Sequence, residues 1–293
     1  SLVNIMALFT VFLIGILWSV FDLIRKKSLN YFNEYEVLLV VILSQLVLFS
    51  FSLFFSDFVL DSHLYFIYYS PLVIMGLLGF SLFLKALKHS EISLTIPLLS
   101  FTPLFSSVYA FLILGEKMSE TNYFGVIVII IGSLILYSKS LHWRELFISP
   151  KVLLKNAHAR LMLIVALIWS LTPVLDKKCL VYTDVYFHGF LQSIGWLVML
   201  PFIIKKDKVN SKNLLKKHSR YIIISVAVVG ASVSLMQFYA LTYNLVPVLE
   251  SFKRSIGIIL SMAFGYFFFK EIINFKKVFS VVIIILGLNL LLS

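Results

Sequence analysis

Long apolar segments recur along the whole chain, and they constrain its fold more than any other feature. About 20 apolar residues cross a bilayer as a helix. On that criterion the sequence predicts ten spans, at residues 2–24, 37–56, 64–84, 93–114, 121–138, 160–175, 185–204, 221–241, 245–269 and 275–292. The connections between the spans are mostly very short, so no large soluble domain fits anywhere in the chain.

The composition supports an all-α integral membrane protein surrounded by the lipid bilayer. Only 13% of the residues are charged, 60% are hydrophobic, and the mean hydropathy is +1.00. A soluble domain carries about 25% charged and 45–50% apolar residues. The first apolar run is too long for the core of a cleavable signal peptide and no basic region precedes it. We therefore expect this run to be the first span itself.

The basic residues are divided unevenly between the two sides of the predicted spans. Twenty of the 25 lie in connections on one side, whereas Lys117, Lys177 and Lys178 lie on the other. The positive-inside rule places the basic side in the cytoplasm and both termini outside. We expect a multi-pass protein of a bacterial cytoplasmic (inner) membrane. The uneven division of basic residues also accounts for the net charge of +11 without a nucleic-acid partner.

The two halves of the chain repeat each other. The stretch ILWSVFDLIRKKSL at 16–29 aligns with LIWSLTPVLDKKCL at 167–180, which places Trp18 opposite Trp169. We therefore predict a first repeat at 1–138, a cytoplasmic linker at 139–159 and a second repeat at 160–293. Each repeat contains an odd number of spans, five, so the second must be inverted in the membrane. Inverted repeats of this kind are typical of secondary transporters.

Later positions of the two halves also match. KAL at 85–87 lies opposite YAL at 239–241, and LGE opposite FKE, ending at Glu116 and Glu271. Each glutamate is followed sixteen positions later by a glycine, Gly132 or Gly287. We expect both glutamates to stabilise the helix ends at which they stand.

These elements, in their order and spacing, resemble the drug/metabolite transporter superfamily and its EamA-type permeases. The resemblance covers essentially the whole chain. It implies ten helices, a central cavity built by spans 1–4 and 6–9, and peripheral spans 5 and 10. Ten-span relatives generally keep both termini in the cytoplasm, whereas the basic residues of this chain place them outside. The resemblance therefore leaves the direction of transport open.

One predicted span contains three charged residues. The stretch VLESFKRSIGIIL at 248–260 includes Glu250, Lys253 and Arg254 near the middle of the ninth span. A central lysine or arginine costs at least about 2.5 kcal/mol in a bilayer. Glu250 and Arg254 are spaced i,i+4, so they share a helix face and can form an ion pair. One carboxylate beside two cations leaves a local charge near +1, which favours a position facing a cavity.

Two interpretations of this cluster stay open. In the first, Arg254 and Lys253 bind an anionic group of a substrate, while Glu250 balances the charge or acts in coupling by exchanging protons. In the second, the three side chains form a closed ion-pair network that only fixes helix packing. The equivalent stretch of the first half, TIPLLSFTP at 95–103, contains no charge. The two halves therefore differ in chemistry while sharing a scaffold.

Other polar and aromatic residues at membrane depth are candidate cavity walls. These substrate-binding candidates are Trp18, Gln45, Trp169, Gln192, Gln237 and Tyr239. The amides can instead hydrogen-bond between helices, worth about 0.6 kcal/mol on average. The tryptophans can instead lie at the membrane interface.

Two further ionisable residues have two interpretations each. His188 can titrate near neutral pH, but it lies a turn from the start of its span, where water can reach it. Asp22 is a possible coupling acid, yet its position three residues before Arg25 favours an ion pair at the membrane interface.

The sequence contains no motif for nucleotide hydrolysis, no metal-ligand spacing and no nucleophilic catalytic set. We therefore predict no enzyme activity and no cofactor. The leading hypothesis is a secondary active transporter that moves a small polar metabolite, an amino acid or organic anion, by alternating access. A coupling proton or an exchanged solute would drive it. The alternatives are a non-transporting membrane scaffold or sensor and a flippase of a lipid-linked anion. The oligomeric state is not predicted.

Overall fold

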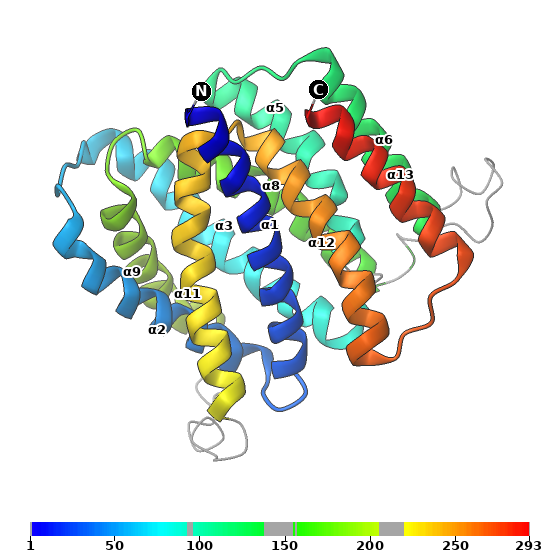
Figure 1. Ribbon diagram of the computed structural model, residues 1–293. Coiled ribbons are helices and arrows are strands. Elements are labelled where there is room, and N and C mark those ends of the chain that lie inside the picture. Colours follow the sequence, from blue (N-terminus) through cyan, green and yellow to red (C-terminus); the bar gives the residue numbers. More distant parts are fainter. Residues whose placement is uncertain (1, 93–95, 138–154, 156, 205–219, 293) are drawn as a thin grey trace.

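The chain folds into a helical bundle, and the computed structural model describes residues 2–92, 96–137, 155, 157–204 and 220–292 of it (Figure 1). Over these residues the bundle has ten α-helices: α1 (Leu2–Ser28), α2 (Glu34–Ser52), α3 (Ser62–His89), α5 (Thr102–Leu114), α6 (Glu120–Tyr137), α8 (Ala157–Cys179), α9 (Val185–Ile203), α11 (Arg220–Tyr243), α12 (Val246–Phe269) and α13 (Phe275–Leu292). There are also two 3₁₀ segments: η1 (Leu53–Phe55) follows α2, and η2 (Ile96–Phe101) precedes α5.

These helices confirm the predicted fold class, since each predicted span corresponds to one of them. Seven are long and apolar enough to cross a membrane, and two shorter apolar helices run over Leu98–Leu114 and Glu120–Ile135. The first residues of the predicted fourth span, 93–95, lie outside the described residues, as does most of the predicted linker at 139–159. The linker prediction therefore stays a prediction.

Local sequence sets several helix boundaries. Asn33 begins α2 with a capping box, in which its side chain accepts from the backbone N–H of Glu36 while the Glu36 carboxylate accepts from the N–H of Asn33. Asp184 caps α9 by accepting from two backbone N–H groups. These bonds satisfy donors that have no partner inside the helix. At the other end of a helix, α5 stops at Gly115 and α12 at Lys270, both in the left-handed conformation.

The packing of the helices follows the repeat. α1 packs against α11 and α12, and its counterpart α8 packs in the same way against α3 and α5. Three pairs join counterpart to counterpart: α2 with α9, α5 with α12, and α6 with α13. This is the arrangement expected of two inverted five-helix repeats. Both chain ends lie at one end of the bundle, called here the terminus end, and α1 descends from it towards the opposite, far end (Figure 1).

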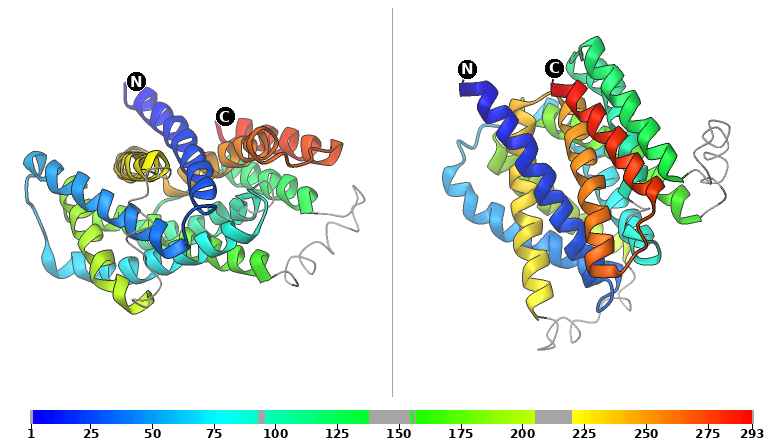
Figure 2. Two further views of the ribbon diagram at one scale, coloured as in Figure 1. Left: turned by 90° about the horizontal axis from the view of Figure 1, so that it is seen from below. Right: turned by 45° about the vertical axis from the view of Figure 1, so that its right-hand side comes forward.

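The fifth helix of each repeat lies at the edge of the bundle, where α6 and α13 run side by side (Figures 1 and 2). Two glycines allow the close approach. A Cβ on Gly132 would lie 3.0 Å from the backbone oxygen of Ser280, and one on Gly287 would lie 2.9 Å from that of Gly125. Small residues at such crossings let membrane helices pack backbone to backbone.

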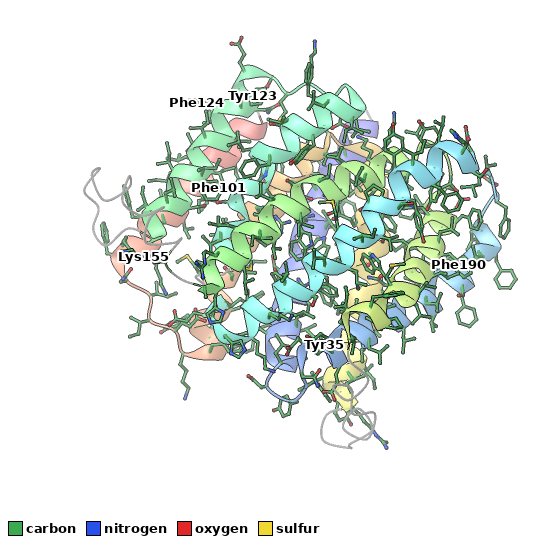
Figure 3. The ribbon with its side chains drawn as sticks, turned by 180° about the vertical axis from the view of Figure 1, so that it is seen from behind. Tyr35, Phe101, Tyr123, Phe124, Lys155 and Phe190 are labelled. Atoms are coloured by element: carbon green, nitrogen blue, oxygen red, sulfur yellow. The ribbon has the colours of Figure 1, made fainter. Side chains whose placement is uncertain are left out.

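The outer surface of the bundle is apolar. Phe124 on α6 is 58% exposed, and Figure 3 shows it beside Tyr123 at the end of the molecule opposite Tyr35. Exposed aromatic and aliphatic side chains of this kind suit a surface that faces lipid rather than water.

Candidate functional site

A cavity of about 100 Å³ lies inside the bundle, lined by side chains from seven helices. Its polar lining residues are Gln45, Thr172, Asp176, Gln192, Ser234, Gln237, Lys253 and Arg254. Its aromatic lining residues are Trp18, Phe21, Phe80, Trp169, Trp196 and Phe238. These residues come from α1, α2, α3, α8, α9, α11 and α12. The resemblance to the family implied a cavity built by spans 1–4 and 6–9, whereas the described part of the fourth span, residues 96–114, contributes no lining residue.

The three charged residues of α12 form one buried cluster. Glu250 is fully buried; its Oε1 accepts from the Lys253 ammonium and its Oε2 accepts from the Arg254 guanidinium at 3.0 Å. Lys253 and Arg254 line the cavity, whereas Glu250 does not. The carboxylate therefore lies behind the two cations and holds them in place. The buried Nε of Arg254 has no hydrogen-bond partner among the described residues.

The two repeat-equivalent tryptophans lie next to these cations. The Lys253 Nζ is 5.1 Å from the centroid of the Trp18 ring, and the Arg254 guanidinium carbon is 5.5 Å from that of Trp169. Gln237 joins the group, since its Oε1 accepts from Trp18 Nε1 at 2.9 Å and from Lys253 Nζ at 3.2 Å. Cation–π contacts of this kind stabilise a desolvated cation by about 2 kcal/mol. The aromatic wall thus helps to keep two positive charges beside the cavity.

The Asp22–Arg25 ion pair expected at the membrane interface is buried instead. Arg25 is fully buried and Asp22 is nearly so, and the guanidinium of Arg25 donates to the Asp22 carboxylate. The rings of Phe21 and Phe83 each lie 4.3 Å from the guanidinium carbon. The surrounding aromatic rings exclude water from a pair that sequence spacing alone places near the surface.

An acidic group on the cavity wall, Asp176, escaped the sequence analysis. Asp176 Oδ1 accepts from Gln192 Nε2 at 2.7 Å and interacts with His188 Nε2 at 3.0 Å. The other ring nitrogen of His188 lies 2.8 Å from the Tyr65 hydroxyl. His188 is fully buried, so the interpretation that water surrounds it is wrong. Asp176 was missed because the predicted sixth span ended at 175, whereas α8 continues to Cys179.

The remaining candidate residues fall into two groups. Gln45 lines the cavity and donates to the Ser234 hydroxyl, a bond between α2 and α11. Tyr239 does not line the cavity, and its hydroxyl donates to the Tyr186 hydroxyl at 2.5 Å. Trp196, which the sequence analysis did not single out, lines the cavity with a buried Nε1 that has no partner among the described residues.

At the terminus end, Glu116 joins the two repeats. Its Oε1 accepts from Lys177 Nζ at 2.5 Å, and its Oε2 accepts from the backbone N–H of Val246 at 2.8 Å. Lys177 also donates to the backbone oxygen of Asn244 at 2.6 Å. We call these four residues the terminus-end latch.

At the far end, Glu271 occupies the equivalent place. Its Oε1 accepts from the backbone N–H of Ile92 at 3.1 Å, and it interacts electrostatically with Lys26. Lys26 donates to the backbone oxygen of Ser90 at 2.6 Å. We call these four residues the far-end latch. Each latch therefore combines a lysine from the first helix of one repeat with a glutamate just after the fourth helix of the other.

Over the described residues, no group of three or more His, Cys, Asp or Glu side chains is placed to hold a metal ion. The polar groups around the cavity can pair with charges and donate hydrogen bonds.

Comparison with known proteins gives a consistent picture of the chain. A model described as the EamA-like transporter family matches residues 5–138 and 159–293. No curated protein matches. A solved structure, described only as a crystal structure of a protein, is similar with a TM-score of 0.66 over 96% of this chain and 95% of that one. The two chains are 10% identical, so this likeness concerns the fold alone.

Proposed function

Because the chain belongs to the EamA-like transporter family, whose members are transporters rather than enzymes, we propose that it is a secondary active transporter for a small anionic or amino-acid-like metabolite. The observation that carries the proposal is the pair of cations on the cavity wall. Lys253 and Arg254 both line the cavity, and the buried Nε of Arg254 has no partner among the described residues. A buried donor without a partner costs about 1–3 kcal/mol, which a carboxylate or phosphate of a substrate would offset.

In this proposal the site residues have distinct roles. Arg254 and Lys253 bind the anionic group, and Glu250 balances their charge from behind. Trp18 and Trp169 form the wall on which the two cations rest. The cavity amides Gln45, Gln192 and Gln237 hydrogen-bond polar groups of the substrate. Tyr239 lies outside this lining and is assigned no contact with the substrate.

The two latches support alternating access as the mechanism. Each places a lysine near a glutamate and uses two backbone groups, the two latches lie at opposite ends of α12, and each links one repeat to the other. Opening the terminus-end latch would expose the cavity to that side, and opening the far-end latch would expose it to the other. In the orientation proposed from the basic residues, the terminus end faces outside, across a bacterial cytoplasmic membrane.

A thermal-shift screen of the detergent-purified protein tests the proposal. The library contains amino acids, organic acids, phosphate esters and amines. A ligand at about 100 times its Kd stabilises by about 2.7 kcal/mol. We expect an anionic compound to raise the Tm of the wild type and of Arg220→Ala, whose exposed residue lies at the start of α11, but not of Arg254→Ala. An amine whose shift survives Arg254→Ala would contradict the anion site.

A second candidate, flipping of a lipid-linked anion, is favoured by one observation. An apolar groove of about 630 Å³ runs between α2 and α11 on the bundle surface. Gln45 and Ser234, which hydrogen-bond to each other, line the central cavity on these same two helices. Opening this contact would give an acyl chain a lateral route to the cations. Reconstituted vesicles distinguish the two candidates, because only the flippase would move a fluorescent anionic lipid between leaflets.

A further inference from the structure

Beside the cation site, Tyr65, His188 and Asp176 form a hydrogen-bonded series of side chains, called here the Tyr65–His188–Asp176 chain. Asp176 lines the cavity, His188 lies directly behind it, and Tyr65 lies behind His188. Both His188 and Tyr65 are fully buried. These residues come from α3, α8 and α9, so the chain crosses from the second repeat into the first.

The hydrogen bonds of this chain suit an imidazole that gains and loses a proton. In neutral His188, Nε2–H donates to the Asp176 carboxylate and Nδ1 accepts from the Tyr65 hydroxyl. In the protonated ring, Nδ1–H donates to the Tyr65 oxygen instead, because a hydroxyl can both donate and accept. Neither state leaves a ring nitrogen without a partner. The carboxylate of Asp176 offsets the cost of a buried imidazolium.

Other ionisable groups face the Tyr65–His188–Asp176 chain from the neighbouring helices. They are Tyr69 on α3, Cys179 on α8, and Lys253 and Arg254 on α12. The Tyr69 hydroxyl donates to the backbone oxygen of Leu191, and Cys179 is a buried thiol. On α11, Phe238 packs edge-on against the His188 ring. The positive charges of Lys253 and Arg254 oppose protonation of the His188–Asp176 pair. An anion bound to these two cations would cancel that opposition.

Among the described residues, the charges around the cavity balance before any solute binds. Lys253 and Arg254 are matched by Glu250 and Asp176, and the buried Asp22–Arg25 pair is neutral by itself. A monoanion bound to the cations would leave one uncompensated negative charge in a site of low dielectric, which is costly. One proton on the His188–Asp176 pair removes that charge.

We propose that Asp176 and His188 form a proton-binding site on the cavity wall, and that a proton from water enters it when a monoanionic solute binds to Lys253 and Arg254. The linkage rests on the proposed function; the proton site itself does not. Proton and anion then cross together. Glu250, whose two oxygens are each held by a cation, supplies the fixed charge rather than the exchangeable one.

Binding of the two ligands is reciprocal. An anion near the cations raises the affinity of the His188–Asp176 pair for a proton, so a lower pH must raise the affinity for the anion by the same factor. Affinity for the anion therefore rises as the pH falls through the midpoint of His188. A zwitterion of similar size, which carries its own positive charge, takes up no proton.

Nuclear magnetic resonance of the full chain in detergent, labelled with ¹⁵N-histidine, tests the proton site without a known substrate. His188→Gln identifies the His188 signals. We expect its ring nitrogens to take up a proton as the pH is lowered. Asp176→Asn removes the negative charge that favours the protonated ring and should lower the midpoint of this uptake. Gln192→Leu is the matched control, because it removes a neutral donor from the same oxygen and should not lower the midpoint.

Two results would overturn the proton site: a His188 ring that does not titrate, or a midpoint unchanged by Asp176→Asn. If that variant does not fold, the wild type decides through its tautomer. Neutral His188 must carry its proton on Nε2, and a proton on Nδ1 contradicts the site.

The linkage is tested with acetate, lactate and dimethyl phosphate as monoanionic probes and alanine as the zwitterion. We expect at least one monoanion to raise the His188 midpoint in the wild type but not in Arg254→Ala, and alanine to leave it unchanged. Failure of every monoanion overturns the linkage. Thermal shifts measured on the same samples separate the two proposals: a monoanion that stabilises the protein without moving the midpoint contradicts only the linkage, whereas a titrating His188 with no anion binding contradicts the anion site, and the linkage with it, but leaves the proton site standing.

Discussion

The last turns of α1 and α8 occupy equivalent places in the two repeats, yet they differ in the charge that they bring to the bundle centre. Aligning Trp18 with Trp169 places Lys26 opposite Lys177 but Arg25 opposite Asp176. The lysines make the same kind of contact, each donating to a backbone oxygen after the third helix of its own repeat. Arg25 is closed off by Asp22 and aromatic rings, whereas Asp176 faces the cavity.

This difference separates two tasks within one scaffold. A bundle that opens at both ends needs an equivalent latch at each end, so the residues of the latches repeat. A single central cavity needs one arrangement of charges, so the residues around it need not repeat. The same contrast holds between α12, which carries two cations to the cavity, and its uncharged counterpart formed by η2 and α5.

The largest effect should come from breaking the closed ion pair of α1. Asp22→Asn leaves the fully buried Arg25 without its carboxylate, and we expect a loss of about 3–5 kcal/mol in the free energy of unfolding. Asp176→Asn should cost about 1 kcal/mol, because the amide oxygen still accepts from Gln192 and His188. Denaturant unfolding in detergent measures both. The exposed Asp57→Asn is the control and should change stability by no more than about 0.5 kcal/mol.

Equal losses for Asp22→Asn and Asp176→Asn would contradict the comparison, since both acids would then be structural.

The two latches should respond in opposite directions. Glu116→Gln removes charge-assisted bonds worth about 1.5–3 kcal/mol at the terminus end, and Glu271→Gln does the same at the far end. Each change shifts the population towards the state open at that end by about tenfold or more. Labelling of Thr172→Cys, a cavity position, in a Cys179→Ser background measures the shift. An impermeant thiol reagent is applied to right-side-out and inside-out vesicles in parallel.

If both latch variants increased labelling from the same face, the latches would not be alternative gates.

The contact between α6 and α13 allows a comparison of two equivalent helices at the edge of the bundle. Gly132→Ala and Gly287→Ala each bring a Cβ to about 3 Å from a backbone oxygen of the partner helix. We expect similar losses of about 1–3 kcal/mol for the two variants, as for other overpacked contacts. Thermal unfolding measures both. Gly115→Ala gives a different kind of control, because its cost arises from φ of 72° rather than from a neighbour.

A large loss at one glycine and none at the other would show that the α6–α13 contact is not symmetric.

The smallest effect concerns the helix ends at which the two glutamates stand. Gly115 ends α5 in the left-handed conformation, and Lys270 ends α12 in the same conformation with φ of 55°. The left-handed conformation costs a residue with a Cβ about 1–2 kcal/mol. Glycine avoids this cost, but part of the gain is lost because glycine gives the unfolded chain more conformational entropy. Lys270→Gly should therefore stabilise by up to about 1 kcal/mol, measured as a rise in Tm. A fall in Tm would mean that the Lys270 side chain itself stabilises this end.

The sequence predicted most of this architecture because membrane helices leave a strong pattern. Ten apolar runs, the repeat of Trp18 and Trp169, and the buried charges of α12 all follow from the order of residues alone. The pairing of Glu250 with Arg254 followed from helical spacing. Contacts between distant segments did not follow, because single-sequence spacing carries no information about which helices meet.

Two errors share one cause. Asp22 and Arg25 were placed at the interface, and Asp176 was taken to lie beyond the sixth span, since charged residues near the end of an apolar run normally mark the membrane boundary. In the structure aromatic rings bury the first pair, and α8 continues past Asp176 to Cys179. Charges near span ends can therefore belong to the interior when neighbouring helices cover them.

Labelling of the double variant Thr172→Cys, Cys179→Ser, in which both latches are intact, tests the central claim of alternating access most directly. Alternating access predicts that the impermeant reagent reaches this cavity position from both faces of the membrane. It also predicts that an anion bound at Arg254 slows the reaction from both. A position that reacts from neither face, or from one face alone, would contradict alternating access.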